Sequence, residues 1–430
     1  MHLKKKPLRS KVTFVVLSAA LSMIPAAGIA SAQIPEEQTS SVNAALFDQY
    51  RSDIVADELQ ASGAKIPSSR ASLLSPQSLE SALESQGVSE DIQERVEDLQ
   101  SAEIVVLRFD EEGVLKEAVS SEEPSKDIKE ERFEEEISKQ SAAAPDTGQE
   151  TESETSASAS FEEGNSNLQT LNAISVNSIL PNTNPAPAGS LTGAFHRITT
   201  PATGGYTGVV ADTLTLPNYD IHNAVNPTDS SLKSEAAYLY TGFDPASGSG
   251  LAEVGLSALE TKSTALGWYP GFHANVAHNV NEGDTNGQTP ATDRHYYDVS
   301  NRFAGGSTIN GYKVYFKSDE TNVTIRMVIN WKQVYVVEFP GKSPANGLAV
   351  KRLTAIGMNG STDRTKKFRI PYTSYAIWGN MKFLKNNGAT AVYSEQVANL
   401  KEEVWAHGGQ IDYVKTGGTT ASREEKIRIY

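Results

Sequence analysis

The pattern of hydrophobic and polar positions alternates with a period of two along most of the chain after about residue 166. Two neighbouring runs, NVTIRMVIN (322–330) and KQVYVVEFP (332–340), each place apolar residues on one face and together predict a β-hairpin. Other alternating runs are separated by turns rich in Gly, Asn and Pro. They predict strands in EAAYLYTGF, LAEVGLSAL, GYKVYFK, LAVKRLTAIGM, SYAIWGNMKFL, GGQIDYVKT and EKIRIY.

The arrangement of these predicted strands indicates the fold class. Many short strands joined by Gly and Asn turns, with almost no helix, are typical of an antiparallel sandwich or barrel. We therefore expect an all-β, concanavalin-like jelly-roll antiparallel sandwich over residues 169–430, preceded by an acidic, partly disordered α+β segment. Within the sandwich region only SEQVANLKEEVW (394–405) has a helical pattern. No longer sequence period repeats, which argues against propellers and solenoids.

Residues 33–119 have a different, partly helical pattern. In NAALFDQYRSDIVADEL (43–59) and SEDIQERVEDLQ (89–100), apolar residues recur at helical spacing. The next run, EIVVLRFDEEGVLKEAV (103–119), predicts a hairpin that turns at Gly113. These elements predict either a small α+β module or a pro-region.

The segments before and after this acidic part are not expected to contribute to a hydrophobic core. Residues 1–32 predict a secretory signal peptide, because basic residues are followed by an apolar run at 12–21 and by small residues at 30–32. Residues 120–168 are first highly charged and then low in complexity, which predicts a disordered linker. We therefore expect a secreted protein, extracellular or associated with the cell wall.

Charge and cysteine usage exclude several classes of function. The formal net charge is −15, but residues 33–165 carry 32 acidic and 10 basic side chains, whereas residues 166–430 carry 21 and 23. A nearly neutral domain has no broad basic face for phosphates, so nucleic acid is not an expected partner. The chain has no Cys, which excludes disulfides, thiol nucleophiles and Cys-bound metals. Cysteine avoidance in an exported chain indicates a Gram-positive bacterium.

Several segments of the predicted sandwich resemble one group of secreted proteins. EAAYLYTGFD, LAEVGLSAL, GWYPGFH and INWKQVYVVEFPG together resemble the YrpD-type proteins of Bacillus. The resemblance implies a concanavalin-like sandwich with no assigned activity. It covers only the part from about residue 173 onward. It transfers no active-site residue.

The run GWYPGFHANVAHNV (267–280) concentrates aromatic and His side chains in one short stretch. Sugars present flat apolar faces edged by hydroxyl groups, so a carbohydrate site needs exposed aromatic planes beside hydrogen-bonding groups. The candidate ligand-binding residues are Trp268, Tyr269, His273, Asn275, Asp293, Arg294, Tyr296 and Trp331. The alternative is that the Trp and Tyr side chains fill the core of the sandwich.

The same region contains two weak candidates for metal binding. His273 and His278 are five residues apart, and with His295 from the next strand they offer a metal site without any established ligand pattern. The oxygen-rich loop that follows offers calcium ligands but lacks the complete calcium-loop pattern, and such residues also occur in any long turn. The candidate calcium ligands are Asn281, Asp284 and Asn286. Apart from calcium, the sequence predicts no cofactor.

Catalysis has only weak candidates, Glu235 and Glu253, which lie in two apolar strands expected to pair. A buried carboxyl group there would have a raised pKa suited to general acid catalysis. The carboxylate motifs that glycosidases on this fold place along one strand are absent, and there is no G-x-S-x-G motif.

These observations support three hypotheses. The first is a secreted, non-catalytic β-sandwich that binds carbohydrate or another component of the cell envelope. The second is a polysaccharide-active hydrolase or lyase on the same fold, and the third is a surface scaffold that mediates protein contacts. After the signal peptide no segment is long and apolar enough to span a membrane, and the sequence defines no oligomeric state.

Overall fold

The structure is a computed structural model of the 430-residue chain. It describes residues 36–66, 75–110, 113–123, 126–131, 176–179, 193–220, 235–245, 249–259, 266–279, 293–318, 322–340, 347–358, 368, 370–388, 390–407, 409–417 and 423–430. The predicted signal peptide and most of the predicted linker lie outside these residues. Among the residues described, no helix has the length and apolar character needed to cross a membrane.

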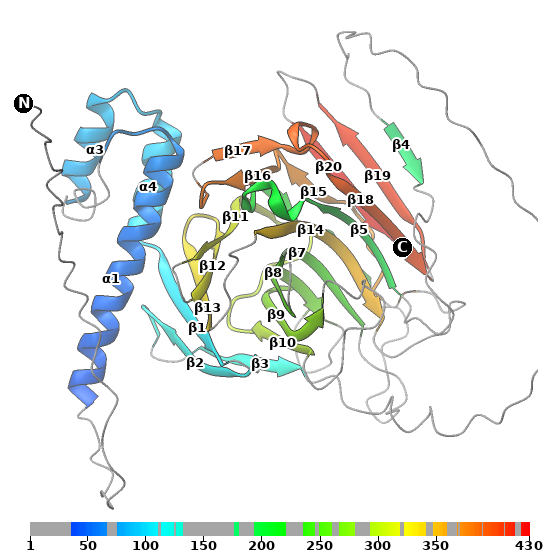
Figure 1. The fold of residues 1–430 in the computed structure, drawn as a ribbon, viewed down its shortest axis with the longest axis horizontal. Helices are drawn as coiled ribbons and strands as arrows, with labels where there is room; N and C mark the ends of the chain where they lie inside the picture. Colours follow the sequence, from blue (N-terminus) through cyan, green and yellow to red (C-terminus); the bar gives the residue numbers. More distant parts are fainter. Residues whose placement is uncertain are drawn as a thin grey trace, which may run out of the picture. The chain divides into compact units, whose positions relative to one another are not determined.

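One layer of the fold is a sheet of twelve strands, called sheet A (Figure 1). Its main path runs β2-β1-β13-β12-β11-β6-β15-β20-β19-β4, and β16 pairs with both β6 and β17. The strands are β1 (Glu103–Phe109), β2 (Leu115–Ser120), β4 (Val176–Ile179), β6 (Tyr206–Thr215), β11 (Thr308–Ser318), β12 (Asn322–Ile329), β13 (Gln333–Pro340), β15 (Ala376–Gly379), β16 (Lys382–Lys385), β17 (Thr390–Tyr393), β19 (Ile411–Thr416) and β20 (Glu424–Ile429).

The second layer is a sheet of eight strands, called sheet B, in the order β18-β5-β14-β7-β8-β9-β10-β3. Its strands are β3 (Ile128–Glu131), β5 (Gly193–Thr199), β7 (Glu235–Pro245), β8 (Ser249–Leu259), β9 (Trp268–Asn279), β10 (Asp293–Asp298), β14 (Leu348–Met358) and β18 (Lys401–His407). All pairs in sheet B are antiparallel. The predicted class, an antiparallel β-sandwich preceded by an N-terminal part with helices, is confirmed, and the described α-helices all lie in that N-terminal part.

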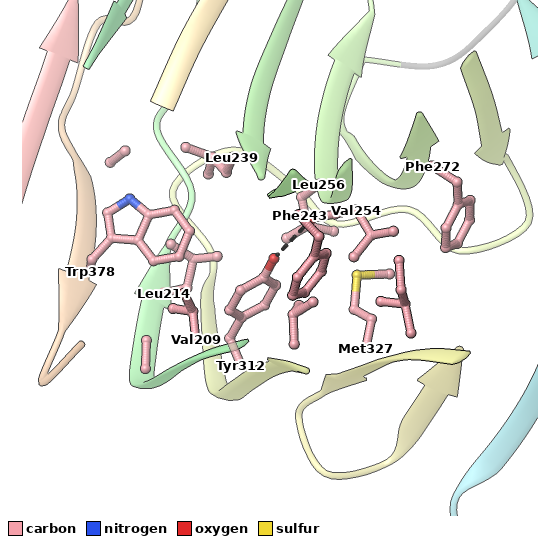
Figure 2. Packing of buried hydrophobic residues seen from close by; sticks show 14 of the residues in the cluster. Val209, Leu214, Leu239, Phe243, Val254, Leu256, Phe272, Tyr312, Met327 and Trp378 are labelled. Carbon is pink, nitrogen blue, oxygen red and sulfur yellow. Dashed lines mark hydrogen bonds between the residues drawn. The ribbon is translucent and has the colours of Figure 1, made fainter. Parts of the chain in front are cut away.

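The core lies between the two sheets and is built from alternate residues of their strands. Sheet A contributes Val209, Tyr312 and Met327, and sheet B contributes Leu239 and Phe272, all essentially inaccessible to solvent (Figure 2). Each fully buried aliphatic or aromatic side chain of this kind stabilises the fold by roughly 1.5–3 kcal/mol. This common core explains why strands that are distant in the sequence form one unit.

The hairpin predicted from the alternation is confirmed as β12 and β13, which pair from Asn322 with Pro340 to Ile329 with Gln333. The turn begins with Asn330 and Trp331, whose φ angles are 54° and 60°. Two successive residues with positive φ match the twist of the flanking strands, and Asn tolerates this conformation better than most residues.

Three α-helices pack on the outer face of sheet A, the face turned away from sheet B. They are α1 (Glu36–Ala61), α3 (Pro76–Ser85) and α4 (Glu90–Gln100). Leu59, Leu83 and Leu99 from these helices form a second apolar cluster with Val334 and Trp331. The helices predicted over 43–59 and 89–100 are therefore confirmed. Helix α3 was not predicted.

Strands from the acidic N-terminal part are members of both sheets. Strand β1 lies parallel to β13, with Val106 opposite Val336, and β3 pairs antiparallel with β10. The apolar run Ile104–Leu107 of β1 is buried on both faces, by the core on one side and by the helices on the other. The hairpin predicted at 103–119 is observed as β1 and β2. Strand β3 lies in the segment for which composition had predicted a linker.

The helix expected over 394–405 is wrong. This segment contains a short 3-10 turn, Ser394–Gln396, and then strand β18. The strand is stabilised by pairing with β5, where Val404 faces the core and Glu403 accepts hydrogen bonds from Arg197. Pairing with the sheet outweighs the weak helical preference of so short a segment.

Candidate functional site

The outer face of sheet B carries a line of charged and imidazole side chains that runs across five adjacent strands. Strand register places Lys351 of β14 opposite Gly242 of β7, Gly242 opposite Glu253 of β8, and Glu253 opposite His273 of β9. His295 of β10 lies opposite His273. We call these five residues the polar row. Their neighbours in each strand face the core, so the row belongs to the face turned away from sheet A.

A glycine makes the central contact of the polar row possible. A Cβ atom on Gly242 would come within 2.7 Å of Lys351 Cε and 3.0 Å of Glu253 Cγ. Because Gly242 has no side chain, Lys351 reaches across β7, and its Nζ lies 3.1 Å from Glu253 Oε1. The same Nζ lies 3.0 Å from Asp244 Oδ2.

The other oxygen of Glu253 orients an imidazole ring. Glu253 Oε2 lies 3.0 Å from His273 Nδ1, and both side chains are largely buried. The His273 Nδ1–H group donates to the Glu253 carboxylate in this geometry, and Nε2 is the second nitrogen of the ring. A carboxylate and histidine arranged in this way form the unit that enzymes use for general base catalysis.

The environment of Glu253 does not produce the raised pKa expected for a general acid. Burial on its own raises the pKa of this carboxyl group, but the ammonium of Lys351 and the hydrogen bond from His273 outweigh burial and lower the pKa far below its usual range. Glu253 is therefore ionised at neutral pH. Its geometry suits it to orient a base, and the expected role as a proton donor is corrected.

The two imidazole rings of the polar row lie face to face. The His273 and His295 rings are 4.0 Å apart and within 8° of parallel. Stacked rings do not point their nitrogen atoms at a common centre, so this pair is not arranged for chelation. Among the residues described, no cluster of three or more His, Asp or Glu side chains is arranged to hold a metal ion.

Tyrosines flank the polar row on the same face. The Tyr240 side chain lies over Gly255 and Gly271, where a Cβ atom would collide with it, and its hydroxyl forms a hydrogen bond with Ser257. The Tyr238 ring lies 5.1 Å from the Tyr240 ring. This side of sheet B therefore combines buried or half-buried tyrosine rings, hydroxyl groups and a buried histidine that contacts a carboxylate.

The predicted aromatic platform is not formed, because the residues proposed for it are buried. Trp268 is 0% exposed, faces the core and donates its Nε1–H to the Pro217 carbonyl at 3.0 Å. Tyr296 is 2% exposed, and its hydroxyl donates to the Gly113 carbonyl. Tyr269 is buried on the outer face of sheet B, where it lies opposite Ser257.

Trp331 lies far from the other predicted residues in the fold, in the turn between β12 and β13 of sheet A. It packs beneath the helices, with the Arg95 guanidinium 5.0 Å from its ring centroid. The side chains of Trp268 and Trp331 therefore serve separate apolar clusters. Burial of large apolar surface explains both placements better than sugar binding does.

For the remaining predicted residues the structure describes the backbone of some and nothing of the others. The backbones of Asn275 and Asp293 lie opposite each other in β9 and β10, and Arg294 lies opposite Ala274. The structure does not describe the side chains of Asn275, Asp293 and His278. The candidate calcium ligands lie outside the described residues, so the calcium site stays a prediction; they are Asn281, Asp284 and Asn286.

The two candidate catalytic carboxylates are not brought together. Glu235 begins β7, whereas Glu253 lies opposite Gly242 of that strand, seven positions further along (242 − 235 = 7). At about 3.3 Å per residue this separation is about 23 Å. Retaining glycosidases require carboxyl groups about 5–5.5 Å apart, so this pair cannot support that mechanism.

Sequence reasoning missed Lys351, Asp244 and Tyr240. The available signal was the charged dipeptide Lys351-Arg352 inside the apolar strand LAVKRLTAIGM, because a charge at such a position needs a buried partner. Arg352 faces the opposite way, into the core, and contacts His196 Nδ1 at 2.8 Å and Glu425. The identities of the partners depended on strand register.

Comparisons with known proteins add little to this description. No model of a protein family matches the sequence, and no curated protein is similar to it at a significant level. Among solved structures, one similar chain is a mutant of the alginate lyase Aly36B in complex with an alginate trisaccharide. The identity is 8%, the match covers 56% of this chain and 71% of that one, and the TM-score is 0.20. A similarity this weak carries no argument about activity.

Proposed function

We propose that the protein is a secreted, polysaccharide-active enzyme that removes a proton from its substrate with His273 on the outer face of sheet B. The observation that carries this proposal is the 3.0 Å contact between Glu253 Oε2 and His273 Nδ1. Glu253 orients the imidazole and stabilises the imidazolium that forms when Nε2 accepts a proton.

Elimination fits this arrangement better than hydrolysis does. Asp244 and Glu253 are close to each other, but the Lys351 ammonium lies between them, so no sugar can occupy that space. In an elimination His273 Nε2 takes the proton next to a uronate carboxyl group, a carbon–carbon double bond forms, and the bond to the glycosidic oxygen breaks. Tyr240 lies on the same face of β7 as Gly242, two residues earlier, and its hydroxyl is a suitable proton donor for the leaving glycosidic oxygen. The proposed substrate class is a uronate-containing polysaccharide, because the carboxyl group of a uronate makes the neighbouring C–H acidic enough for a base to remove its proton.

The test is an activity assay with the full mature chain on a panel of uronate-containing and neutral polysaccharides. Ultraviolet absorbance reports unsaturated products, and a reducing-end assay reports hydrolysis. We expect unsaturated products from a uronate polymer, and a loss of about 10²–10⁴-fold in rate for His273→Gln and Glu253→Gln. Lys332→Ala, an exposed change on the opposite sheet, is the control and leaves the rate unchanged. Product formation that survives His273→Gln would rule out this residue as the base.

Non-catalytic carbohydrate binding is the second candidate. It is favoured by the ion pairs within the outer face of sheet B, such as Arg197 with Glu403 at 2.8 Å, which hold a rigid polar surface. Retention on one insoluble polymer without any product would support this candidate over the enzyme. Export from a Gram-positive cell, membership of the YrpD-type group and calcium binding are further proposals from the sequence, and they are compatible with both functions.

A further inference from the structure

Lys351 carries the ammonium group of the polar row, and its side chain is almost completely buried. Its side chain is 4% exposed, and its Nζ lies 3.0 Å from Asp244 Oδ2 and 3.1 Å from Glu253 Oε1. The three residues come from adjacent strands, β14, β7 and β8. One amine therefore contacts two carboxylates in a largely water-free environment.

The cluster of Lys351, Asp244 and Glu253 has more negative than positive charge. Two carboxylates share a single ammonium, while Glu253 also contacts His273. The second oxygen of Asp244, Oδ1, is buried and accepts no hydrogen bond from the described residues. An unsatisfied buried carboxylate oxygen is costly, whereas a neutral amide in its place would remove two buried charges.

We propose that Lys351 and Asp244 condense to form an intramolecular isopeptide bond between β14 and β7, with Glu253 as the proton shuttle. The Lys351 ammonium passes one proton to the Asp244 carboxylate, and the resulting neutral Nζ attacks Cγ of the carboxylic acid. Glu253 then moves a second proton from Nζ to a carboxyl oxygen, and that oxygen leaves as water. One C–N bond forms, one C–O bond breaks, and no oxidant or cofactor is needed. The amide carries no charge, so Glu253 loses the ammonium beside it and keeps the remaining amide N–H and His273 as its partners.

The positions of the other enclosed lysines make this proposal specific. Lys313 Nζ contacts Glu58 at 2.9 Å, and among the described residues no second carboxylate lies within salt-bridge distance of it. Lys126 Nζ, on a side chain that is 5% exposed, contacts Glu103 at 2.5 Å, but its second carboxylate, Glu123, lies 3.8 Å away and is exposed. The less enclosed Lys317, whose side chain is 32% exposed, contacts Asp57, which is also held by the permanently charged Arg326. Only at Lys351, in the part of the chain that the structure describes, do an Asp and a second carboxylate both lie within 3.1 Å of one enclosed amine.

Such a bond has a clear physical value in this chain. It would link residues 107 positions apart (351 − 244 = 107) in a protein without any Cys. Closing a long loop covalently restricts the unfolded chain, which is how disulfides stabilise many secreted proteins. The bond would also hold the central strands of sheet B together beneath the proposed active site.

The test is the mass of the purified full mature chain, measured under denaturing conditions and followed by peptide mapping. We expect a mass lower than the calculated one by one water molecule, and a branched peptide that contains Lys351 and Asp244. Lys351→Arg keeps the positive charge but cannot form the bond, so its mass is expected to equal the calculated value. Asp244→Asn forms the same amide by releasing ammonia, and its final mass is expected to equal that of the cross-linked wild type.

A wild-type chain of full calculated mass, with Lys351 and Asp244 in separate linear peptides, overturns the proposal and leaves an ion pair only. This measurement needs no substrate and no variant, so a variant that fails to fold does not affect it. Its failure can also be told apart from a failure of the proposed activity, because a cross-linked chain without enzymatic activity and an active chain without the cross-link are distinguishable results.

Discussion

The outer faces of the two sheets both bury charges, but the charges have different partners. On sheet A, Arg326 and Lys313 pair with Asp57 and Glu58 of helix α1, more than 250 residues away in the sequence. On sheet B the polar row pairs strand with strand inside one sheet. The buried charges of the two sheets therefore have two different structural roles. On sheet A the pairs hold a helix on the sheet, whereas on sheet B they connect neighbouring strands of one sheet.

The sheet A network can be broken at its most connected residue, Asp57. The Asp57 carboxylate accepts hydrogen bonds from Arg326 at 2.7 Å and from the Tyr315 hydroxyl at 2.9 Å, and it also pairs with Lys317. Asp57→Ala removes a partner from the buried side chains of Arg326 and Tyr315, so we expect a loss of about 3–5 kcal/mol in the free energy of unfolding. Urea titration followed by circular dichroism measures it.

A matched control for Asp57→Ala is Lys116→Ala, which removes an exposed ion pair with Asp110 and is expected to cost less than about 1 kcal/mol. Equal losses in the two variants would contradict a structural role for the charges beneath α1.

The contact between Lys351 and Glu253 in the polar row can be broken without changing any charge. In Gly242→Ala the new methyl group overlaps Lys351 and Glu253, so the two side chains must separate. We expect a loss of about 1–3 kcal/mol from overpacking, together with loss of the isopeptide bond. Thermal unfolding and peptide mapping measure the two effects. Gly357→Ala on β14, whose nearest neighbouring atom is a Tyr238 ring carbon at 3.2 Å, is a milder control that should keep the bond.

The smallest expected effect is a pH dependence of stability that comes from His196, a buried residue between the two sheets. His196 accepts a hydrogen bond from Arg352 at Nδ1, and its Nε2 lies 2.7 Å from Glu402. Burial first, and then the nearby Arg352, lower the pKa of His196 below its usual 6.5, while Glu402 and Glu425 act in the opposite direction. The folded protein therefore keeps the ring neutral while the unfolded chain takes up a proton.

This difference sets the sign of the pH dependence. The stabilising contribution of a neutral His196 is fully present well above pH 6.5 and decreases as the pH falls from 6.5 toward the lower pKa of the folded state. The slope is at most about 1.4 kcal/mol per pH unit. His196→Gln should flatten stability against pH in this range, as measured by urea titration at several pH values. An unchanged slope would contradict the lowered pKa, because it would mean that His196 has the same pKa in the folded and unfolded states.

Local pattern predicted much of the fold because strand alternation depends only on neighbouring residues. The alternation of Val323, Ile325 and Met327 with polar residues was enough to predict β12 and its inner face. The same local rule predicted a helix at 394–405, where pairing with β5 decided otherwise. The helical spacing in α1 was visible, but nothing local indicated that Asp57 would meet Arg326.

The candidate site was predicted only in its parts. Glu253, His273 and His295 were each singled out, and His295 was expected beside the other histidine. The aromatic residues expected to form an exposed platform are buried, and the sequence could not show this because it does not say which face of a strand is buried more deeply. Trp268 and His273 lie on the same strand but on opposite faces, and only the packed sheets assign one to the core and the other to the polar row.

The sequence by itself determined that this is a cysteine-free β-sandwich chain with an acidic, helical N-terminal part, because composition and short-range periodicity carry that information. Only the tertiary structure decided that β1 and β3 belong to the sheets, that Lys351 reaches Glu253 across Gly242, and that Glu235 lies far from Glu253. The physical reason is strand register. Register depends on which strands pair and where, and shifting it by one residue turns every side chain of a strand to the other face.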